Sequence, residues 1–201
     1  MPSEKALTLE ATVKLIVGLG NPGANYDRTR HNAGADLVLE LAKSLHSELK
    51  HESKFFGDTA RVTIGTRDVR LLVPSTFMNL SGKSIAALAK FYQIAPEHIL
   101  VVHDELDLDP GIARFKKGGG HGGHNGLRDT IKSLGNSTDF ARLRIGIGHP
   151  GQANQVADYV LKKASPSDQQ LIANSIDDAL RYLPLAVDGQ WEKAMTALHS
   201  C

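Results

Sequence analysis

The sequence contains a single cysteine, Cys201, among its 201 residues. An internal disulfide is therefore excluded, and neither a thiolate metal cluster nor a buried cysteine nucleophile is expected. Aromatic residues make up only 5% of the chain. No apolar run approaches the roughly 18 residues that a membrane-spanning helix needs. Residues 1–12 lack the basic start and apolar core of a signal peptide, so we expect a flexible N-terminal extension and a cytoplasmic protein.

Motifs for several common chemistries are incomplete. Residues 18–23 have the spacing of a dinucleotide fingerprint, but Pro22 stands where the phosphate-binding helix would start. Residues 82–84 match the end of a phosphate-binding loop, but Phe77 occupies the position of its first glycine. No Gly-x-Ser-x-Gly nucleophile motif is present, so a hydrolase with this sequence would use water as its nucleophile.

Histidines between positions 103 and 124 raise the question of a metal site. His121 and His124 flank a Gly-Gly pair, and their spacing fits neither a helical i, i+4 pair nor a common zinc-finger pattern. We therefore expect no bound metal. A metal-dependent hydrolase that uses His103, His121 or His124 stays open as an alternative.

Strands and helices are predicted to alternate, which indicates an α/β fold: a single domain, residues 1–201, with a twisted mixed β-sheet and helices packed on both faces. Continuous apolar runs predict buried strands. The predicted strands are 13–20, the hairpin 59–64 and 69–73 around the turn 65–68, the buried strand 99–103, the exposed strand 113–117 and the alternating strand 140–147.

Helices are predicted where apolar residues recur at three- and four-residue spacing. Their buried faces are Val38, Leu41, Ala42 and Leu45; Ile85, Leu88, Ala89 and Tyr92; Leu127, Ile131 and Leu134; and Ile172, Ile176, Ala179, Leu180 and Leu183, before a last C-terminal helix. Ser81 is expected to cap the second helix, which should end just before Pro96, and Ser165 to cap the fourth.

Positive charge is concentrated in one segment although the net charge is only +1. Residues 113–144 contain seven basic and two acidic residues, whereas the rest of the chain has 16 basic and 20 acidic residues. Such clustering indicates a polyanionic partner, and a solvated face with chance charge is the alternative. The basic residues are Arg114, Lys116, Lys117, Arg128, Lys132, Arg142 and Arg144.

Polar clusters follow three of the predicted strands, where open α/β sheets bind ligands. They span residues 20–32, 77–79 and 103–105, the last continuing into 118–125. Each contains an asparagine at the expected edge, and the three are Asn21, Asn79 and Asn125. An amide donates and accepts hydrogen bonds without ionising, which suits a peptide bond, a base edge or an oxyanion, although asparagine is also common in turns.

His31 is the candidate general base. A lone histidine is more often structural than catalytic, but Asp104 at the end of a buried strand is a suitable carboxylate to orient it. Such a carboxylate fixes the tautomer of the ring and raises the basicity of its other nitrogen.

These clusters coincide with motifs that resemble bacterial peptidyl-tRNA hydrolases over nearly the whole chain. The matching segments are 18–34 (GLGNPG, then Tyr26 and TRHNxG), 74–82 (PxTFMNxSG), 103–107 (HDExD), 118–128 (GGGHGGHNGLR) and 142–150 (RLRIGIGHP). The resemblance implies hydrolysis of the ester between a peptide and the 3′-terminal ribose of its tRNA, which recycles stalled peptidyl-tRNA. It implies a cytoplasmic enzyme without a cofactor, a membrane or an obligate protein partner, and we expect a monomer.

The resemblance also assigns roles to individual residues. His31 would be the general base, Asp104 its supporting carboxylate, and Asn21 the residue that discriminates peptidyl from free aminoacyl substrates. The peptide and the acceptor end of the tRNA would be contacted by Tyr26, Phe77, Asn79 and Asn125. Lys116 and Arg144, assisted by Arg114, would hold the 5′ phosphate. The chief alternative is a non-catalytic RNA-binding module, which would tolerate changes at His31.

Overall fold

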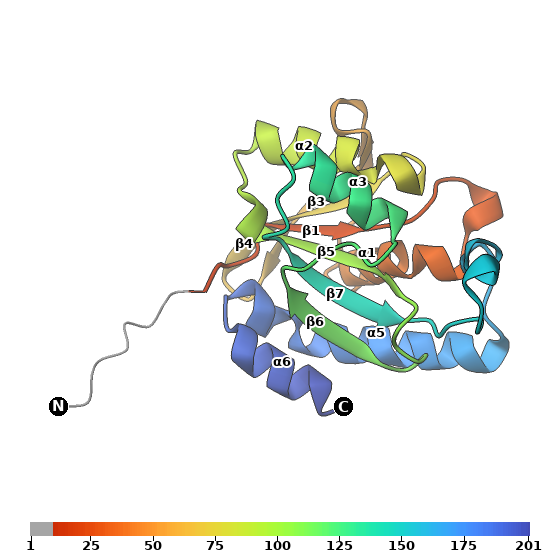
Figure 1. Cartoon of the computed structure of the whole chain (residues 1–201). Coiled ribbons are helices and arrows are strands. Elements are labelled where there is room, and N and C mark those ends of the chain that lie inside the picture. The colour runs from red at the N-terminus through yellow and green to blue at the C-terminus, as the bar shows by residue number, and fades with distance from the viewer. Residues whose placement is uncertain (1–9) are drawn as a thin grey trace.

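The computed structural model describes residues 10–201, which form a central mixed sheet with helices on both faces, as predicted (Figure 1). The strands are β1 (Leu15–Gly18), β2 (Lys50–Glu52), β3 (Gly57–Ile64), β4 (Arg67–Pro74), β5 (Ile99–Glu105), β6 (Ala113–Lys117) and β7 (Ala141–Gly146). The helices are α1 (Ala33–Ser44), α2 (Ser81–Phe91), α3 (Asn125–Ser133), α4 (Val156–Val160), α5 (Pro166–Val187) and α6 (Trp191–His199).

The strand order is β2-β3-β4-β1-β5-β7-β6. Strands β4, β1, β5 and β7 run parallel to one another, whereas β2, β3 and β6 pair antiparallel with their neighbours. The carboxyl ends of the four parallel strands therefore meet at one edge of the sheet. The chain connects β1 to strands on both of its sides, and such a reversal places ligand sites at this edge.

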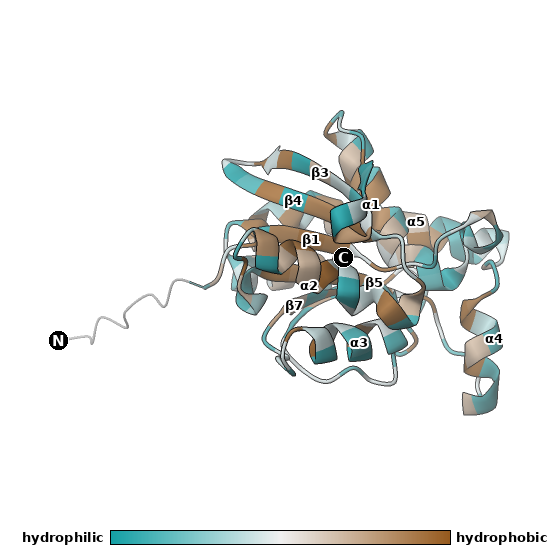
Figure 2. Cartoon of the chain, turned by 90° about the horizontal axis from the view of Figure 1, so that it is seen from above, coloured by the Kyte–Doolittle hydropathy of each residue, from teal (hydrophilic) through white to brown (hydrophobic). Residues whose placement is uncertain are grey.

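Each face of the sheet has its own hydrophobic core. Helices α1, α5 and α6 pack on one face, and α2 and α3 pack on the other (Figure 1). Strand β1 is completely buried because parallel strands flank it and helices cover both of its faces. Figure 2 shows this distribution, with apolar residues in the central strands and hydrophilic ones on the outer faces of the helices.

Two glycines allow α1 to start directly against the sheet. A Cβ atom at Gly34 would lie 2.1 Å from the backbone oxygen of Val102 in β5. A Cβ atom at Gly18 would lie 2.5 Å from the oxygen of Gly34. Because glycine has no Cβ atom, the first turn of α1 can lie directly against β1 and β5.

The boundaries of some predicted elements were wrong. Only Gly65 and Thr66 form the hairpin turn, because the positive φ of 62° at Gly65 closes a two-residue loop. Ser81 is not a cap: it is the first residue of α2, and its hydroxyl donates to the backbone oxygen of Met78 at 2.7 Å. Helix α2 ends at Phe91, well before Pro96, because Gln93 turns the chain with a φ of 53°.

Other elements differ from the expectation through tertiary contacts. Strand β6 is only half exposed, because α6 covers it and Phe115 packs edge-on against Trp191 at 5.8 Å between ring centroids. The short elements β2 and α4 were not predicted. Ser165 does cap α5, since its hydroxyl accepts a hydrogen bond from the backbone of Asp168.

The expected N-terminal extension covers residues 1–12, of which 1–9 lie outside the described part of the chain. The backbone oxygen of Ala11 accepts a hydrogen bond from the Trp191 indole at 2.9 Å, and that of Thr12 is 2.7 Å from Nδ1 of His98. Within residues 10–201, no helix combines the length and apolar character needed to cross a membrane.

Candidate active site

A buried carboxylate joins two imidazoles at the carboxyl ends of β1 and β5. Asp104 lies in β5, His31 lies in the short 3-10 helix Arg30–Asn32 before α1, and His124 is the residue that precedes α3. Oδ2 of Asp104 is 2.8 Å from Nδ1 of His31, and Oδ1 is 2.7 Å from Nε2 of His124. The predicted contact between His31 and Asp104 is therefore present.

The hydrogen bonds assign the protons on both rings. Nδ1 of His124 accepts from the backbone N–H groups of Gly126 and Leu127, so its Nε2 carries the hydrogen that Asp104 accepts. The carboxylate likewise accepts from Nδ1–H of His31. Among the described residues no group hydrogen-bonds Nε2 of His31, which leaves this nitrogen free to accept a proton.

Electrostatics favour an ionised Asp104 and a basic His31. Burial by itself would raise the pKa of Asp104, but the hydrogen bonds from His124 and His31, together with the charge of His31 when it is protonated, hold this pKa well below its usual range. Burial would lower the pKa of His31, but the charge and hydrogen bond of Asp104 outweigh it and raise that pKa above its ordinary value. The carboxylate of Asp104 therefore favours the protonated form of His31, which suits a residue that accepts a proton.

His103 differs from its neighbours. Its Nδ1 is 2.8 Å from the backbone oxygen of Asp104. Burial lowers the pKa of His103 to about 3, so this ring is neutral. His103 is a structural neighbour of the Asp104 cluster rather than a second base.

A cavity of about 760 Å³ opens beside this cluster. His31, Asp104 and Asn125 line it, and so do Lys116 and Arg144. Arg114 is not among the lining residues, although it is paired with Arg144 across β6 and β7. The apolar part of the wall consists of Leu106, Leu127, Ala153, Val156, Ala157 and Val160.

Asn21 is fixed in place by three hydrogen bonds, although it does not line this cavity. Its side-chain oxygen accepts from the backbone N–H of Met78 at 2.7 Å. Its backbone N–H and oxygen bond the side chain of Asn32 at 2.8 and 3.0 Å. The side-chain NH₂ of Asn21 has no partner among the described residues, so it is a free and oriented donor.

The remaining predicted contact residues lie outside the cavity. Tyr26 and Phe77 form an edge-on aromatic pair with centroids 6.1 Å apart, and Phe77 is 55% exposed. Asn79 is exposed in the 3-10 helix Met78–Leu80, which packs against α3. An aromatic side chain this exposed adds little to the core, but it offers a surface for stacking.

Arg142 belongs to the scaffold although it lies in the basic segment. It is only 1% exposed and donates hydrogen bonds to the backbone oxygens of Phe140, at 2.8 Å, and of Gly119. Burial lowers its pKa to about 10. Its bond to Gly119 fixes the glycine-rich segment that leads to His124.

Sequence reasoning missed the roles of His124 and Asn32. His124 was considered only as a metal ligand, whereas it caps α3 and donates to Asp104. The ligand atoms of His31, Asp104 and His124 lie within 4.8 Å of one another, a spacing that could hold a metal ion. Their mutual hydrogen bonds already satisfy the carboxylate, and His124 has no free nitrogen left for a metal.

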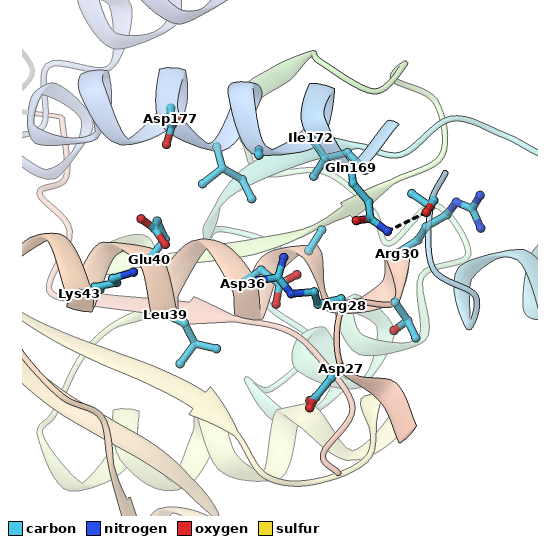
Figure 3. A pocket seen from close by; sticks show the side chains of 15 residues that line it. Asp27, Arg28, Arg30, Asp36, Leu39, Glu40, Lys43, Gln169, Ile172 and Asp177 are labelled. Carbon is cyan, nitrogen blue, oxygen red and sulfur yellow. Dashed lines mark hydrogen bonds between the residues drawn. The ribbon is translucent and has the colours of Figure 1, made fainter. Parts of the chain in front are cut away.

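A second cavity of about 650 Å³ lies between α1 and α5 (Figure 3). Neither His31 nor His124 lines it, and its charged lining residues are of both signs. Asp36 of α1 faces it, and burial raises the pKa of this carboxyl to about 6, with Arg28 opposing and Asp27 adding to the shift.

The Asp36→Asn substitution is expected to stabilise the protein at neutral pH. The pKa of Asp36 is about 6 in the folded protein against an ordinary 3.8, so ionisation opposes folding as pH rises between these values. Removing the charge should raise the free energy of unfolding at pH 7 by about 1–3 kcal/mol. A small part of this gain is lost, because a negative charge in the first turn of α1 interacts favourably with the helix dipole. Denaturant unfolding at pH 4 and pH 7 measures the gain, with Asp177→Asn on the opposite wall as control. An equal gain at both pH values would contradict this explanation.

Comparisons with known proteins agree with the geometry. A family model described as "Peptidyl-tRNA hydrolase" matches residues 15–201. The peptidyl-tRNA hydrolase from Shewanella halifaxensis is 60% identical over 190 residues, which cover 94% of this chain and 98% of that protein. The one from Vibrio parahaemolyticus is 60% identical over 188 residues, which cover 94% of this chain and 96% of that protein. The crystal structure of peptidyl-tRNA hydrolase from Acinetobacter baumannii superimposes with a TM-score of 0.89 at 52% identity, covering 92% of this chain and 94% of that chain.

Proposed function

Because the chain belongs to the peptidyl-tRNA hydrolase family and acts as a hydrolase on peptidyl-tRNA, we propose that His31 is the general base of this reaction. The observation that carries this proposal is the Nδ1–Asp104 hydrogen bond of 2.8 Å, which leaves Nε2 of His31 free at the cavity. In this proposal Asp104 holds the ring in the reactive tautomer, and His124 helps to keep Asp104 ionised.

The chemistry needs only one base and one donor. Water attacks the ester carbonyl while Nε2 of His31 removes its proton. The resulting oxyanion accepts a hydrogen bond from the free NH₂ group of Asn21, and such a donor contributes about 10²–10³ in rate. The intermediate then expels the 3′-terminal ribose oxygen, which takes the proton from His31, so peptide and free tRNA are released.

Neutral amides explain how a peptidyl group is told from a free aminoacyl group. The peptidyl group presents an amide, whereas a free aminoacyl group presents a charged amine. Asn21, Asn79 and Asn125 can hydrogen-bond the amide. The amine would lose hydration without meeting an opposite charge, so it binds less well.

The basic and aromatic side chains bind the end of the tRNA. Lys116 and Arg144 line the cavity together and hold the 5′ phosphate of the acceptor stem, with Arg114 assisting from its position beside Arg144. Tyr26 and the exposed Phe77 stack with the unpaired 3′ end. Because phosphate contacts and base stacking do not depend on the nucleotide sequence, one enzyme can accept many tRNAs.

Replacing both Lys116 and Arg144 with alanine is expected to separate tRNA binding from chemistry. The double variant should raise KM for a blocked aminoacyl-tRNA about 10- to 100-fold, with a weaker dependence on salt. A minimal blocked aminoacyl-adenosine ester, which has no 5′ phosphate of a tRNA, should be cleaved as by the unchanged protein. Lys90 and Lys193, both exposed outside the cavity, provide a matched double control. Equal losses on both substrates would refute a phosphate clamp.

The activity itself is tested with a blocked aminoacyl-tRNA and its unblocked counterpart, with chelator present throughout. We expect cleavage of the blocked substrate alone. A non-catalytic RNA-binding module would cleave neither substrate, and a metal-dependent hydrolase would lose activity to the chelator. We further propose that the protein acts as a monomer in the cytoplasm, where translation produces its substrate, and sedimentation at micromolar concentration tests the monomer.

A further inference from the structure

Arg30, the neighbour of His31, makes a separate set of contacts with the segment that contains α4. Its Nη1 donates to the backbone oxygen of Tyr159 at 2.9 Å, and its guanidinium lies 3.8 Å from the centroid of the Tyr159 ring. Its backbone N–H donates to the oxygen of Lys162 at 3.0 Å. Arg30 also lines the second cavity, and Figure 3 shows its side chain extending away from Asp36.

The segment that Arg30 holds is also a wall of the catalytic cavity. Ala153, Val156, Ala157 and Val160 supply much of its apolar lining. Tyr159 links the same segment to the end of β7, because its hydroxyl donates to the oxygen of Ile147 at 2.6 Å. The Arg30–Tyr159 contact therefore joins the turn of His31 to the apolar wall on one side and to β7 on the other.

Besides these contacts, a backbone bridge between Thr29 and Lys163 and the packing of the partly buried Val156 and Tyr159 against the core hold this wall. Helix α4 has five residues, and Val160 is its one buried residue. A short segment with one buried residue opens at lower free-energy cost than the core elements, so its specific contacts help to determine its position. Arginine suits this position because a planar guanidinium can stack on a ring and donate to a carbonyl at the same time, which the ammonium of lysine does less well.

We propose that Arg30 is a positioning residue that sets the distance between His31 and the apolar wall formed by α4, and so determines how tightly apolar peptidyl groups bind. This inference rests on the proposed function, since it concerns the same cavity. Arg30 acts through Tyr159 and takes no part in proton transfer. Its loss should therefore weaken substrate binding without changing the ionisation of His31.

The test compares Arg30→Met, Arg30→Lys and Tyr159→Leu in the full chain. With a blocked phenylalanyl-tRNA, Arg30→Met is expected to raise KM about 5- to 30-fold and to change kcat less than about 3-fold, with Arg30→Lys in between. With a blocked glycyl-tRNA the rise in KM should be smaller. The acid limb of the pH–rate profile should not move. The double variant Arg30→Met/Tyr159→Leu should add little to either single change, because both remove the same contact.

Hydrogen exchange of the protein alone keeps this test independent of the proposed function. Arg30→Met and Tyr159→Leu should both speed exchange in residues 153–163 and leave β5 unchanged. Arg181→Met, which removes an exposed arginine lying 6.0 Å from the Tyr182 ring, is the matched control and should change neither exchange nor KM. Unchanged exchange in residues 153–163, or a fall in kcat with a shifted pH profile, would overturn the proposal. Absence of activity in the unchanged protein, with the exchange result as expected, would instead refute the proposed function.

Discussion

Replacing His31 with asparagine is expected to slow single-turnover cleavage of a blocked aminoacyl-tRNA by about 10²–10⁴-fold, the usual contribution of a general base. The asparagine amide can still donate a hydrogen bond toward Asp104, which makes it a mild replacement for the largely buried ring. It cannot accept a proton from water. Binding of tRNA should change little, because the proposed phosphate contacts come from Lys116 in β6 and Arg144 in β7 and not from the segment of His31.

His51 provides a matched control for this substitution. It forms a histidine–aspartate pair of similar geometry, with Nδ1 2.9 Å from Oδ1 of Asp58, but this pair is exposed on β2 and β3. His51→Asn should therefore leave the rate unchanged. A near-native rate in His31→Asn, measured with enzyme in excess, would remove His31 from the mechanism.

The second large effect is expected for Asp104→Asn, with a loss of about 10²–10⁴-fold in the same assay at neutral pH. A neutral amide cannot stabilise an imidazolium as a carboxylate does. In the unchanged protein both His31 and His124 donate to Asp104, but an asparagine has only one oxygen to accept, so its NH₂ group must face one of the two rings. The reactive tautomer of His31 then loses its support. Asp58→Asn is the matched control, since it neutralises the carboxylate of the exposed pair.

The pH dependence of this variant has a definite direction. Protonated His31 cannot act as a base, so the rate rises as pH passes the pKa of His31, which Asp104 raises above its ordinary value. In Asp104→Asn the carboxylate no longer raises the pKa of His31, whereas burial still lowers it. The acid limb of the pH–rate profile should therefore move to lower pH. An acid limb that stays in place would show that another group controls the ionisation.

Stability should change in the same variant. The folded pKa of Asp104 is depressed, so its ionisation stabilises the fold above the ordinary carboxyl pKa and the contribution is lost as pH falls through the folded value. Asp104→Asn is therefore expected to unfold at lower denaturant concentration at pH 7. The rate comparison is made in buffer where circular dichroism shows each variant folded.

The sheet and the central pair of the site could be predicted from the sequence because both depend on regular features. The apolar run that becomes β1 has no polar position, as a strand covered on both faces requires. Carboxyl ends of parallel strands meet at one edge, so polar residues after β1 and at the end of β5 were expected to lie together. His31 and Asp104 do so, although 73 residues separate them.

The rest of the site depends on long-range contacts that local patterns do not reveal. His124 follows two glycines with φ of 57° and 84°, which bend the chain so that the ring reaches Asp104 and the first turn of α3 at once. Arg142 is identical in type to Arg144 and two positions away, but it bonds backbone oxygens inside the protein. Only the packing of the glycine-rich segment distinguishes these two arginines.

An NMR titration of the ring nitrogens of His31, in protein labelled with ¹⁵N-histidine, reports the tautomer and the ionisation on which general-base catalysis depends. At high pH we expect Nδ1 to carry the hydrogen and Nε2 to carry none, with a titration midpoint above that of a free histidine. In Asp104→Asn the midpoint should fall. A hydrogen on Nε2 in the unchanged protein, or the same midpoint in Asp104→Asn as in the unchanged protein, would contradict the proposed pairing of His31 with Asp104.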